Sequence, residues 1–220
     1  MAHKHTLYKK QVADIRPVAD GVFTLSFIRD FSFKAGQVVA IDLVPDGKPR
    51  MYSIASGENE DCIEILFDEK KNGKLTPFLS KLKVGDTIYA SEPFGTFRTD
   101  VGKGYWIASG TGIAPFISAL RSGMIEQKTM MHGGRFDVNF YYSALIEKLL
   151  PTKNYVRCCS KQDDTQYYKG RLTQWLKAEV NLPKDAKYYL CGSPEMVVEV
   201  RDILISAKIP FQNIISETYF

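Results

Sequence analysis

Backbone amides and small side chains gather in the segment Gly110-Thr111-Gly112-Ile113-Ala114-Pro115, directly after the apolar run 105–109. Glycines let amides approach a phosphate group closely, and the N-terminal end of the helix expected next favours an anion. Pro115 suits the first turn of that helix. The segment therefore predicts a phosphate-binding loop, with an ordinary strand–turn–helix connection as the alternative.

Two earlier segments could bind the same kind of ligand. Arg50-Met51-Tyr52-Ser53 supplies a cation, a flat ring and a hydroxyl, which suit a ligand with a phosphate and a planar ring. Strand alternation puts Arg50 and Tyr52 on one face and Ser53 on the other. Gly73-Lys74-Leu75-Thr76 precedes a helix expected over 77–82, with Thr76 as its N-cap, and its amides could contact an anion. An exposed arginine beside a half-buried tyrosine, and a plain helix cap, are the structural alternatives.

Two further segments lie near the C-terminus. Cys191-Gly192-Ser193-Pro194-Glu195-Met196 follows a buried strand, and ligands of open α/β sheets bind outside such strand ends. Cys191 could touch a substrate there or serve only as a small buried hydrophobe. The chain ends on Glu217-Thr218-Tyr219-Phe220, whose aromatic rings could pack on the fold or cover a flat ligand.

These segments sit on two different patterns of secondary structure. Residues 1–99 predict a six-stranded antiparallel β-barrel, with strands over 6–15, 22–29, 37–44, 50–55, 62–68 and 87–91. Residues 100–220 alternate strands and helices, which is typical of a parallel sheet with helices on both faces. Five strands are expected near 105–109, 128–132, 155–160, 188–191 and 213–217, with helices from about 114 and near 138–150, 172–179 and 194–207. The polar segment 98–104 is the expected domain boundary.

Composition narrows the functional classes. The chain of 220 residues has 29 Lys and Arg against 25 Asp and Glu, a net charge of +4 without a basic run, so nucleic-acid binding is not indicated. No apolar run approaches the ~20 residues of a membrane helix, and the N-terminus has no secretory apolar region. We therefore expect a cytoplasmic protein without membrane insertion. The four cysteines lack the spacings of zinc or iron–sulfur sites, so no metal is expected.

Taken together, the RxYS, GKLT, GTGIAP and CGSPEM segments resemble, in order and spacing, the motifs of the plant-type ferredoxin–NADP(+) reductase family. The bacterial ferredoxin/flavodoxin reductase branch is the most similar, and the resemblance covers nearly the whole chain. It implies an FAD-binding barrel followed by an NADP(H)-binding α/β domain. It places Arg50 at the FAD pyrophosphate, Tyr52 on the isoalloxazine ring and Ser53 near flavin N5. It also implies FAD contacts from Met51, Gly73, Lys74, Leu75 and Thr76.

The resemblance assigns the nicotinamide nucleotide to the second half of the chain. Gly110, Thr111, Gly112 and Pro115 would line its pyrophosphate, and Cys191, Gly192 and Met196 its nicotinamide. Arg135, Ser160, Lys161 and Arg171 match the adenosine 2′-phosphate site, and this basic set favours NADPH, although Asp163 and Asp164 are close in sequence. The expected catalytic residues are Ser53, Cys191, Glu217 and Tyr219. Tyr219 would stack on the flavin and move for hydride transfer, and Phe220 would contact FAD or only pack.

The implied activity is electron transfer between NADP(H) and an acidic one-electron carrier, ferredoxin or flavodoxin, through non-covalent FAD, by a monomer or weak dimer. Alternatives are the reductase component of an oxygenase and an NAD(P)H:flavin reductase. A non-catalytic flavin- or nucleotide-binding sensor or assembly subunit is the alternative from another class. Reduction by a nicotinamide nucleotide would separate an enzyme from that sensor.

Overall fold

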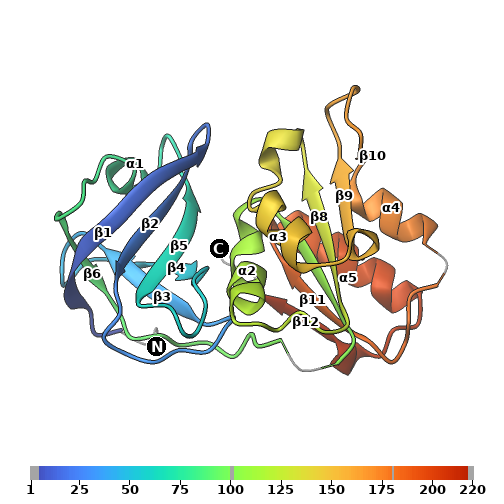
Figure 1. The fold of residues 1–220 in the computed structure, drawn as a ribbon, viewed down its shortest axis with the longest axis horizontal. Helices are drawn as coiled ribbons and strands as arrows, with labels where there is room; N and C mark the ends of the chain where they lie inside the picture. Colours follow the sequence, from blue (N-terminus) through green and yellow to red (C-terminus); the bar gives the residue numbers. More distant parts are fainter. Residues whose placement is uncertain (1–4, 100–101, 180, 218–220) are drawn as a thin grey trace.

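Two β-sheets from the two halves of the chain lie side by side (Figure 1). The computed structural model describes residues 5–99, 102–179 and 181–217. The N-terminal sheet is antiparallel and the C-terminal sheet is parallel. The predicted succession of an antiparallel barrel and an α/β unit is therefore confirmed.

The antiparallel sheet has six strands in the order β4-β3-β6-β1-β2-β5. They are β1 (Tyr8–Ala19), β2 (Val22–Ile28), β3 (Val38–Asp42), β4 (Arg50–Ser53), β5 (Cys62–Asp68) and β6 (Thr87–Ala90). An isolated antiparallel bridge joins Ile54, just after β4, to Ile65 of β5, so the two edges of the sheet meet. The barrel interior is filled by apolar side chains such as Leu25, Phe27 and Ile41.

Strand β1 runs four residues further than the predicted 6–15. Its last residues pair with β2 across a register shift between Pro17 and Ala19. A bulge lets proline sit in a strand without interrupting every ladder bond, which is why the proline did not end the strand.

The short helix α1 (Thr76–Leu79) corrects one prediction: Leu75, and not Thr76, is at the N-cap position. Thr76 Oγ1 instead accepts a hydrogen bond from the Lys70 amide at 2.9 Å. A threonine hydroxyl can satisfy a loop amide or a helix amide, and the loop amide is the one within reach here. The helix also ends at Leu79, short of the predicted 82.

The parallel sheet has six strands in the order β10-β9-β8-β7-β11-β12. They are β7 (Gly104–Ser109), β8 (Lys128–Gly134), β9 (Tyr155–Cys159), β10 (Tyr168–Lys169), β11 (Lys187–Cys191) and β12 (Ile214–Glu217). The parallel arrangement is as predicted, but the expected five strands omitted β10. That edge strand has two residues, too few for any periodicity to reveal it.

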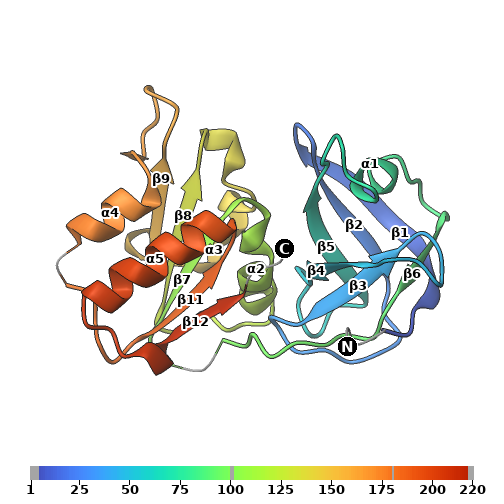
Figure 2. The same ribbon diagram turned by 180° about the vertical axis from the view of Figure 1, so that it is seen from behind.

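Helices cover both faces of the parallel sheet, with α2 (Ala114–Arg121) and α3 (Ser143–Leu149) on one and α4 (Leu172–Ala178) and α5 (Pro194–Ser206) on the other (Figures 1 and 2). The helix predicted over 138–150 is wrong in its first part. A 3-10 turn occupies Asp137–Asn139, and Tyr142 has a left-handed φ of 58°, so α3 begins only at Ser143. A residue with positive φ interrupts a right-handed helix.

Helix α2 also packs on the barrel. One apolar cluster contains Phe116 and Ile117 of α2 together with Leu66 of β5 and Phe97 of the segment between the domains. The core is therefore continuous from one sheet to the other, and α2 is the element that joins them.

Candidate active site

A cavity of about 1020 Å³ opens where the two halves of the chain meet. Its parallel-sheet side is built at the carboxyl ends of strands, by Ser109, the last residue of β7, and Cys191, the last residue of β11. Its barrel side is built by β4 and the end of β5. Open α/β sheets bind ligands outside these strand ends. The volume is at the upper limit for small-molecule sites, which suits ligands of dinucleotide size.

Most of the predicted site residues reach this one cavity. They are contributed by seven separate segments of the chain: Met51, Tyr52, Ser53, Thr76, Gly110, Thr111, Gly112, Arg135, Ser160, Arg171, Cys191, Gly192 and Met196.

Other predicted residues are placed elsewhere: Arg50, Gly73, Lys74, Leu75, Pro115, Lys161 and Glu217 do not line the cavity. Leu75 packs in the barrel core, and Pro115 is buried in the first turn of α2. Arg50 is exposed at the start of β4. Tyr219 and Phe220 lie outside the described residues.

Tyr52 supplies the barrel side of the cavity with a ring and a buried hydroxyl. Its hydroxyl is buried and makes no hydrogen bond among the described residues, and the ring stands edge-on to Phe67 at a centroid distance of 6.3 Å. Burial raises the pKa of Tyr52. A buried hydroxyl without a partner is unfavourable, so this atom is suited to a polar group of a bound ligand.

Two loops of the parallel-sheet domain touch each other through glycines. A Cβ on Gly112 would lie 2.5 Å from the carbonyl oxygen of Cys191, and a Cβ on Gly192 would lie 2.3 Å from Ser109 Oγ. Gly110 has a φ of +56°, a conformation that favours glycine. The glycines predicted for phosphate approach thus also allow the loop after β7 to pack against the loop after β11.

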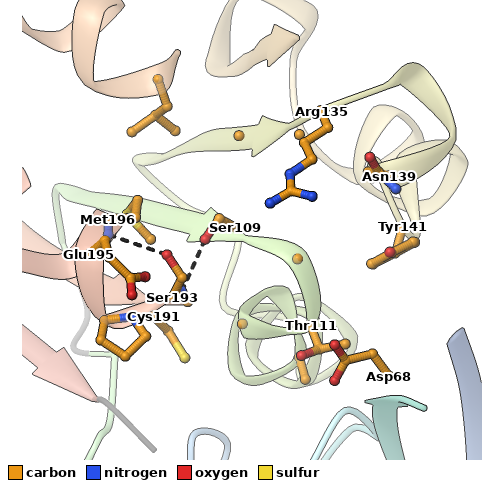
Figure 3. A pocket seen from close by; sticks show the side chains of 18 of the residues that line it. Asp68, Ser109, Thr111, Arg135, Asn139, Tyr141, Cys191, Ser193, Glu195 and Met196 are labelled. Atoms are coloured by element: carbon orange, nitrogen blue, oxygen red, sulfur yellow. Dashed lines mark hydrogen bonds between the residues drawn. The ribbon is translucent and has the colours of Figure 1, made fainter. Parts of the chain in front are cut away.

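Helix α5 points its N-terminal end at the cavity. Ser193 caps the helix by accepting a bond from the Met196 amide at 3.3 Å, and the Ser193 amide donates to Ser109 Oγ at 3.2 Å (Figure 3). The helix has 13 residues, and a helix N-terminus of this kind favours anions. Ser193, Pro194 and Glu195 all line the cavity.

Cys191 and Glu217 are neighbours across β11 and β12. Burial, with a smaller contribution from the Glu217 charge, raises the pKa of the Cys191 thiol, so the thiol stays protonated at neutral pH. A protonated buried thiol is a poor nucleophile, which agrees with the contact role implied by the resemblance. A Cβ on Gly95 would lie 3.9 Å from Glu217 Oε1, so this carboxylate faces the barrel.

Positive charge collects at the other end of the cavity. Arg135 follows β8 and its guanidinium points into the cavity (Figure 3), and Arg171 lies just before α4. The Ser160 hydroxyl donates to the Gly134 carbonyl at 3.2 Å. The Lys161 backbone amide donates to the Arg135 carbonyl at 2.9 Å, and Lys161 does not line the cavity.

Several lining residues escaped the sequence reasoning. Ser193 lies inside the CGSPEM segment and Ser109 directly precedes the GTGIAP segment, so their position in the sequence could have indicated them. Asp68 ends β5, and Asn139 and Tyr141 lie in the segment before α3; they carry no such signal, because only the fold brings these two segments to one cavity (Figure 3).

Comparison with known proteins agrees with this arrangement. An oxidoreductase FAD-binding domain model matches residues 16–99, and an oxidoreductase NAD-binding domain model matches residues 106–202. The chain is 32% identical to the ferredoxin–NADP reductase of Pseudomonas aeruginosa, over 91% of this chain and 90% of the relative. The chain belongs to the ferredoxin–NADP reductase family. It is an oxidoreductase with an FAD-binding and an NAD(P)-binding domain.

Solved structures share the fold of this family member. A ferredoxin–NADP(+) reductase from Neisseria gonorrhoeae with bound FAD and NADP superposes with a TM-score of 0.85 at 20% identity, covering 97% of this chain and 99% of that one. The chain is also similar to longer proteins: it is 25% identical to the toluate 1,2-dioxygenase electron transfer component of Pseudomonas putida, over 96% of this chain but only 67% of the relative.

The described part of the chain shows neither a cluster of metal ligands nor a membrane-spanning helix. No group of three or more His, Cys, Asp or Glu among the described residues could hold a metal ion. Within the same residues, no helix has the length and apolar character needed to cross a membrane.

Proposed function

We propose that this chain transfers electrons between NADP(H) and a one-electron carrier, ferredoxin or flavodoxin, through FAD held by residues 1–99, with NADP(H) held by residues 100–220. One observation carries the proposal. A single cavity joins Tyr52 and Ser53 of the barrel to Thr111, Cys191 and Arg135 of the parallel-sheet domain. A site that spans both domains can bring two cofactors into contact.

The barrel side fits a flavin. Tyr52 offers a ring and a buried hydroxyl that has no hydrogen-bond partner among the described residues, and Ser53 offers a second hydroxyl from the neighbouring position. Thr76 and Lys70 line the same side, where an amide-rich loop and a cation suit phosphate oxygens. When bound, FAD supplies the exchange between hydride transfer and single-electron transfer.

The chain's own residues bind, orient and exclude water. The N-terminus of α5 and the loop 110–113 attract the phosphates of a dinucleotide. Arg135 and Arg171 attract further phosphate at the opposite end of the cavity. Cys191 offers a small, protonated, uncharged surface beside the Glu217 carboxylate, which leaves room for a flat ring. Holding two reactants in one orientation is the main contribution that a protein makes to such a reaction.

The proposal of ferredoxin or flavodoxin as the carrier is supported by the names of relatives and by the net charge of this chain. Relatives are named ferredoxin–NADP reductase, and one from Rhodobacter capsulatus, 31% identical, is named flavodoxin/ferredoxin–NADP reductase. The net charge of +4 suits an acidic carrier. A cytoplasmic location remains a prediction.

The test is the visible spectrum of the purified protein, recorded anaerobically before and after stoichiometric NADPH. We expect a bound-flavin spectrum that bleaches, and reoxidation on addition of ferredoxin or flavodoxin. A yellow protein that neither NADPH nor NADH bleaches would refute the redox function. Reoxidation by free FMN but by neither carrier protein would point instead to a flavin reductase.

A further inference from the structure

An acidic side chain lies at the basic end of the cavity. Glu199 of α5 lines the cavity together with Arg171, whose guanidinium Nη1 lies 3.8 Å from Glu199 Oε2. The other carboxylate oxygen accepts a bond from Lys177 Nζ of α4 at 3.2 Å. The Glu199 side chain is 35% exposed, half the 69% of Arg171, so it is the more firmly positioned of the pair.

Glu199 is charged at neutral pH. Desolvation acts to raise its pKa, but the hydrogen bond from Lys177 and the charges of Lys177 and Arg171 lower it below the ordinary value. Only two of the three cations predicted for a 2′-phosphate, Arg135 and Arg171, line the cavity. The carboxylate, itself partly neutralised by Lys177, therefore offsets part of the positive charge of Arg171 that would select a phosphorylated nucleotide.

We propose that Glu199 is a specificity-determining residue that reduces the preference of this site for a 2′-phosphorylated adenosine over its 2′-hydroxyl form. The inference rests on the proposed binding of NADP(H). The carboxylate forms an ion pair with the guanidinium of Arg171 and repels a nearby phosphate group. It can also accept a hydrogen bond from a ribose hydroxyl, the contact by which acidic residues favour the unphosphorylated nucleotide.

The chain offers a matched control on the same helix. Asp202 lies one turn beyond Glu199 on α5 and lines a second hollow of about 510 Å³ between α4 and α5, but not the first cavity. Asp202→Asn and Glu199→Gln each remove one negative charge, and the two positions are three residues apart on α5. A general effect of net charge would act in both variants, whereas a local effect would act only in the Glu199 variant.

The experiment is calorimetric titration of the FAD-loaded protein with 2′,5′-ADP and with 5′-AMP. We expect Glu199→Gln to tighten 2′,5′-ADP binding about fivefold to tenfold, to leave 5′-AMP within about twofold, and Asp202→Asn to change neither. Equal affinities of the unaltered protein and Glu199→Gln for 2′,5′-ADP would overturn the inference while leaving the proposed function intact. Failure of the unaltered protein to bind 2′,5′-ADP would overturn the proposed NADP(H) site and the inference with it.

A second variant tests the route through Glu199 independently. Lys177 touches Glu199 and does not line the first cavity, so Lys177→Met leaves Glu199 free to pair with Arg171 alone. We expect 2′,5′-ADP to bind about threefold more weakly to Lys177→Met, and the same substitution to have little effect when Glu199→Gln is already present. Equal losses in both backgrounds would overturn the proposed role of Glu199.

Discussion

Arg121 and Glu64 join the two domains: Nη1 of Arg121, at the end of α2, donates to Oε1 of Glu64 on β5 at 2.6 Å. The same guanidinium donates from Nε to Glu60 at 2.7 Å, and the Tyr142 hydroxyl donates to the same Glu64 oxygen at 2.9 Å. The Glu64 side chain is only 8% exposed. Because α2 begins at the glycine loop of the cavity, this network ties that loop to the barrel.

Arg121→Ala should lower the free energy of unfolding by about 2–4 kcal/mol, because it leaves the buried Glu64 carboxylate without its main charge partner. Urea denaturation followed by far-ultraviolet circular dichroism measures the change. Arg16→Ala is the matched control, since Arg16 also approaches Glu64, at 3.6 Å, but is 64% exposed. That variant should cost less than about 1 kcal/mol. Similar losses in the two variants would show that burial does not strengthen the Arg121 contacts.

Tyr52→Phe should weaken FAD binding about threefold to tenfold without destabilising the FAD-free protein. The hydroxyl has no partner among the described residues, so its removal costs the fold nothing, whereas one hydrogen bond to the ligand is lost. Fluorescence titration with FAD and thermal unfolding of the FAD-free protein measure the two effects. Unchanged FAD affinity would remove the Tyr52 hydroxyl from the flavin contacts.

Gly112→Ala should weaken NADP(+) binding more than tenfold and leave FAD binding unaltered. The new Cβ would lie 2.5 Å from backbone atoms of Cys191 and Gly192, which must move and carry the N-terminus of α5 with them. Gly85→Ala is the control, because Gly85 has a φ of +92° but nothing within 4 Å of its added Cβ. That change should cost stability and leave both ligands unaffected. Calorimetric titration of each variant distinguishes these cases.

Arg135→Ala and Lys161→Ala should separate the two cations that the sequence alone treats as equivalent. Arg135 lines the cavity and Lys161 does not, so we expect Arg135→Ala to weaken NADP(+) binding about tenfold and Lys161→Ala to change it less than twofold. Dissociation constants measured at fixed salt concentration provide the comparison. A larger loss from Lys161→Ala would mean that the side chain turns toward the nucleotide when it binds.

His132 should make the fold sensitive to acid. Burial, assisted by the charge of Arg157, lowers the pKa of His132 to about 3. The unfolded chain, with an ordinary pKa of about 6.5, therefore binds the extra proton first, and stability falls as pH drops from about 6.5 toward 3. At pH 5 the loss from this group is about 2 kcal/mol.

The variant His132→Phe tests this dependence. Urea denaturation at pH 7 and pH 5 should give a difference in unfolding free energy about 2 kcal/mol smaller in the variant. His132→Gln, which keeps a hydrogen-bonding group for the Tyr155 hydroxyl that lies 3.2 Å from His132 Nδ1, controls for the lost contact. An equal pH dependence in all three proteins would contradict the assignment.

Local chemistry made much of the fold predictable. Alternating apolar residues and glycine turns specify the six barrel strands, because a strand with one buried face needs a period of two. Features that depend on a few residues were missed: the two-residue β10, the Thr76 hydroxyl bound to Lys70, and the left-handed Tyr142. In each of these cases a single contact or dihedral angle outweighs local propensity.

The sequence by itself determined the two-domain order and the loops that meet at the cavity, because glycine, proline and hydroxyl spacings express local backbone requirements. Only the tertiary structure decided which charged residues join those loops. Arg135 and Lys161 are equivalent candidates in the sequence, but Arg135 lines the cavity and Lys161 does not. Glu199 and Arg171 are 28 positions apart and meet only because α4 packs on α5. Electrostatic contacts of this kind depend on distance through space, which the spacing of residues along a chain does not record.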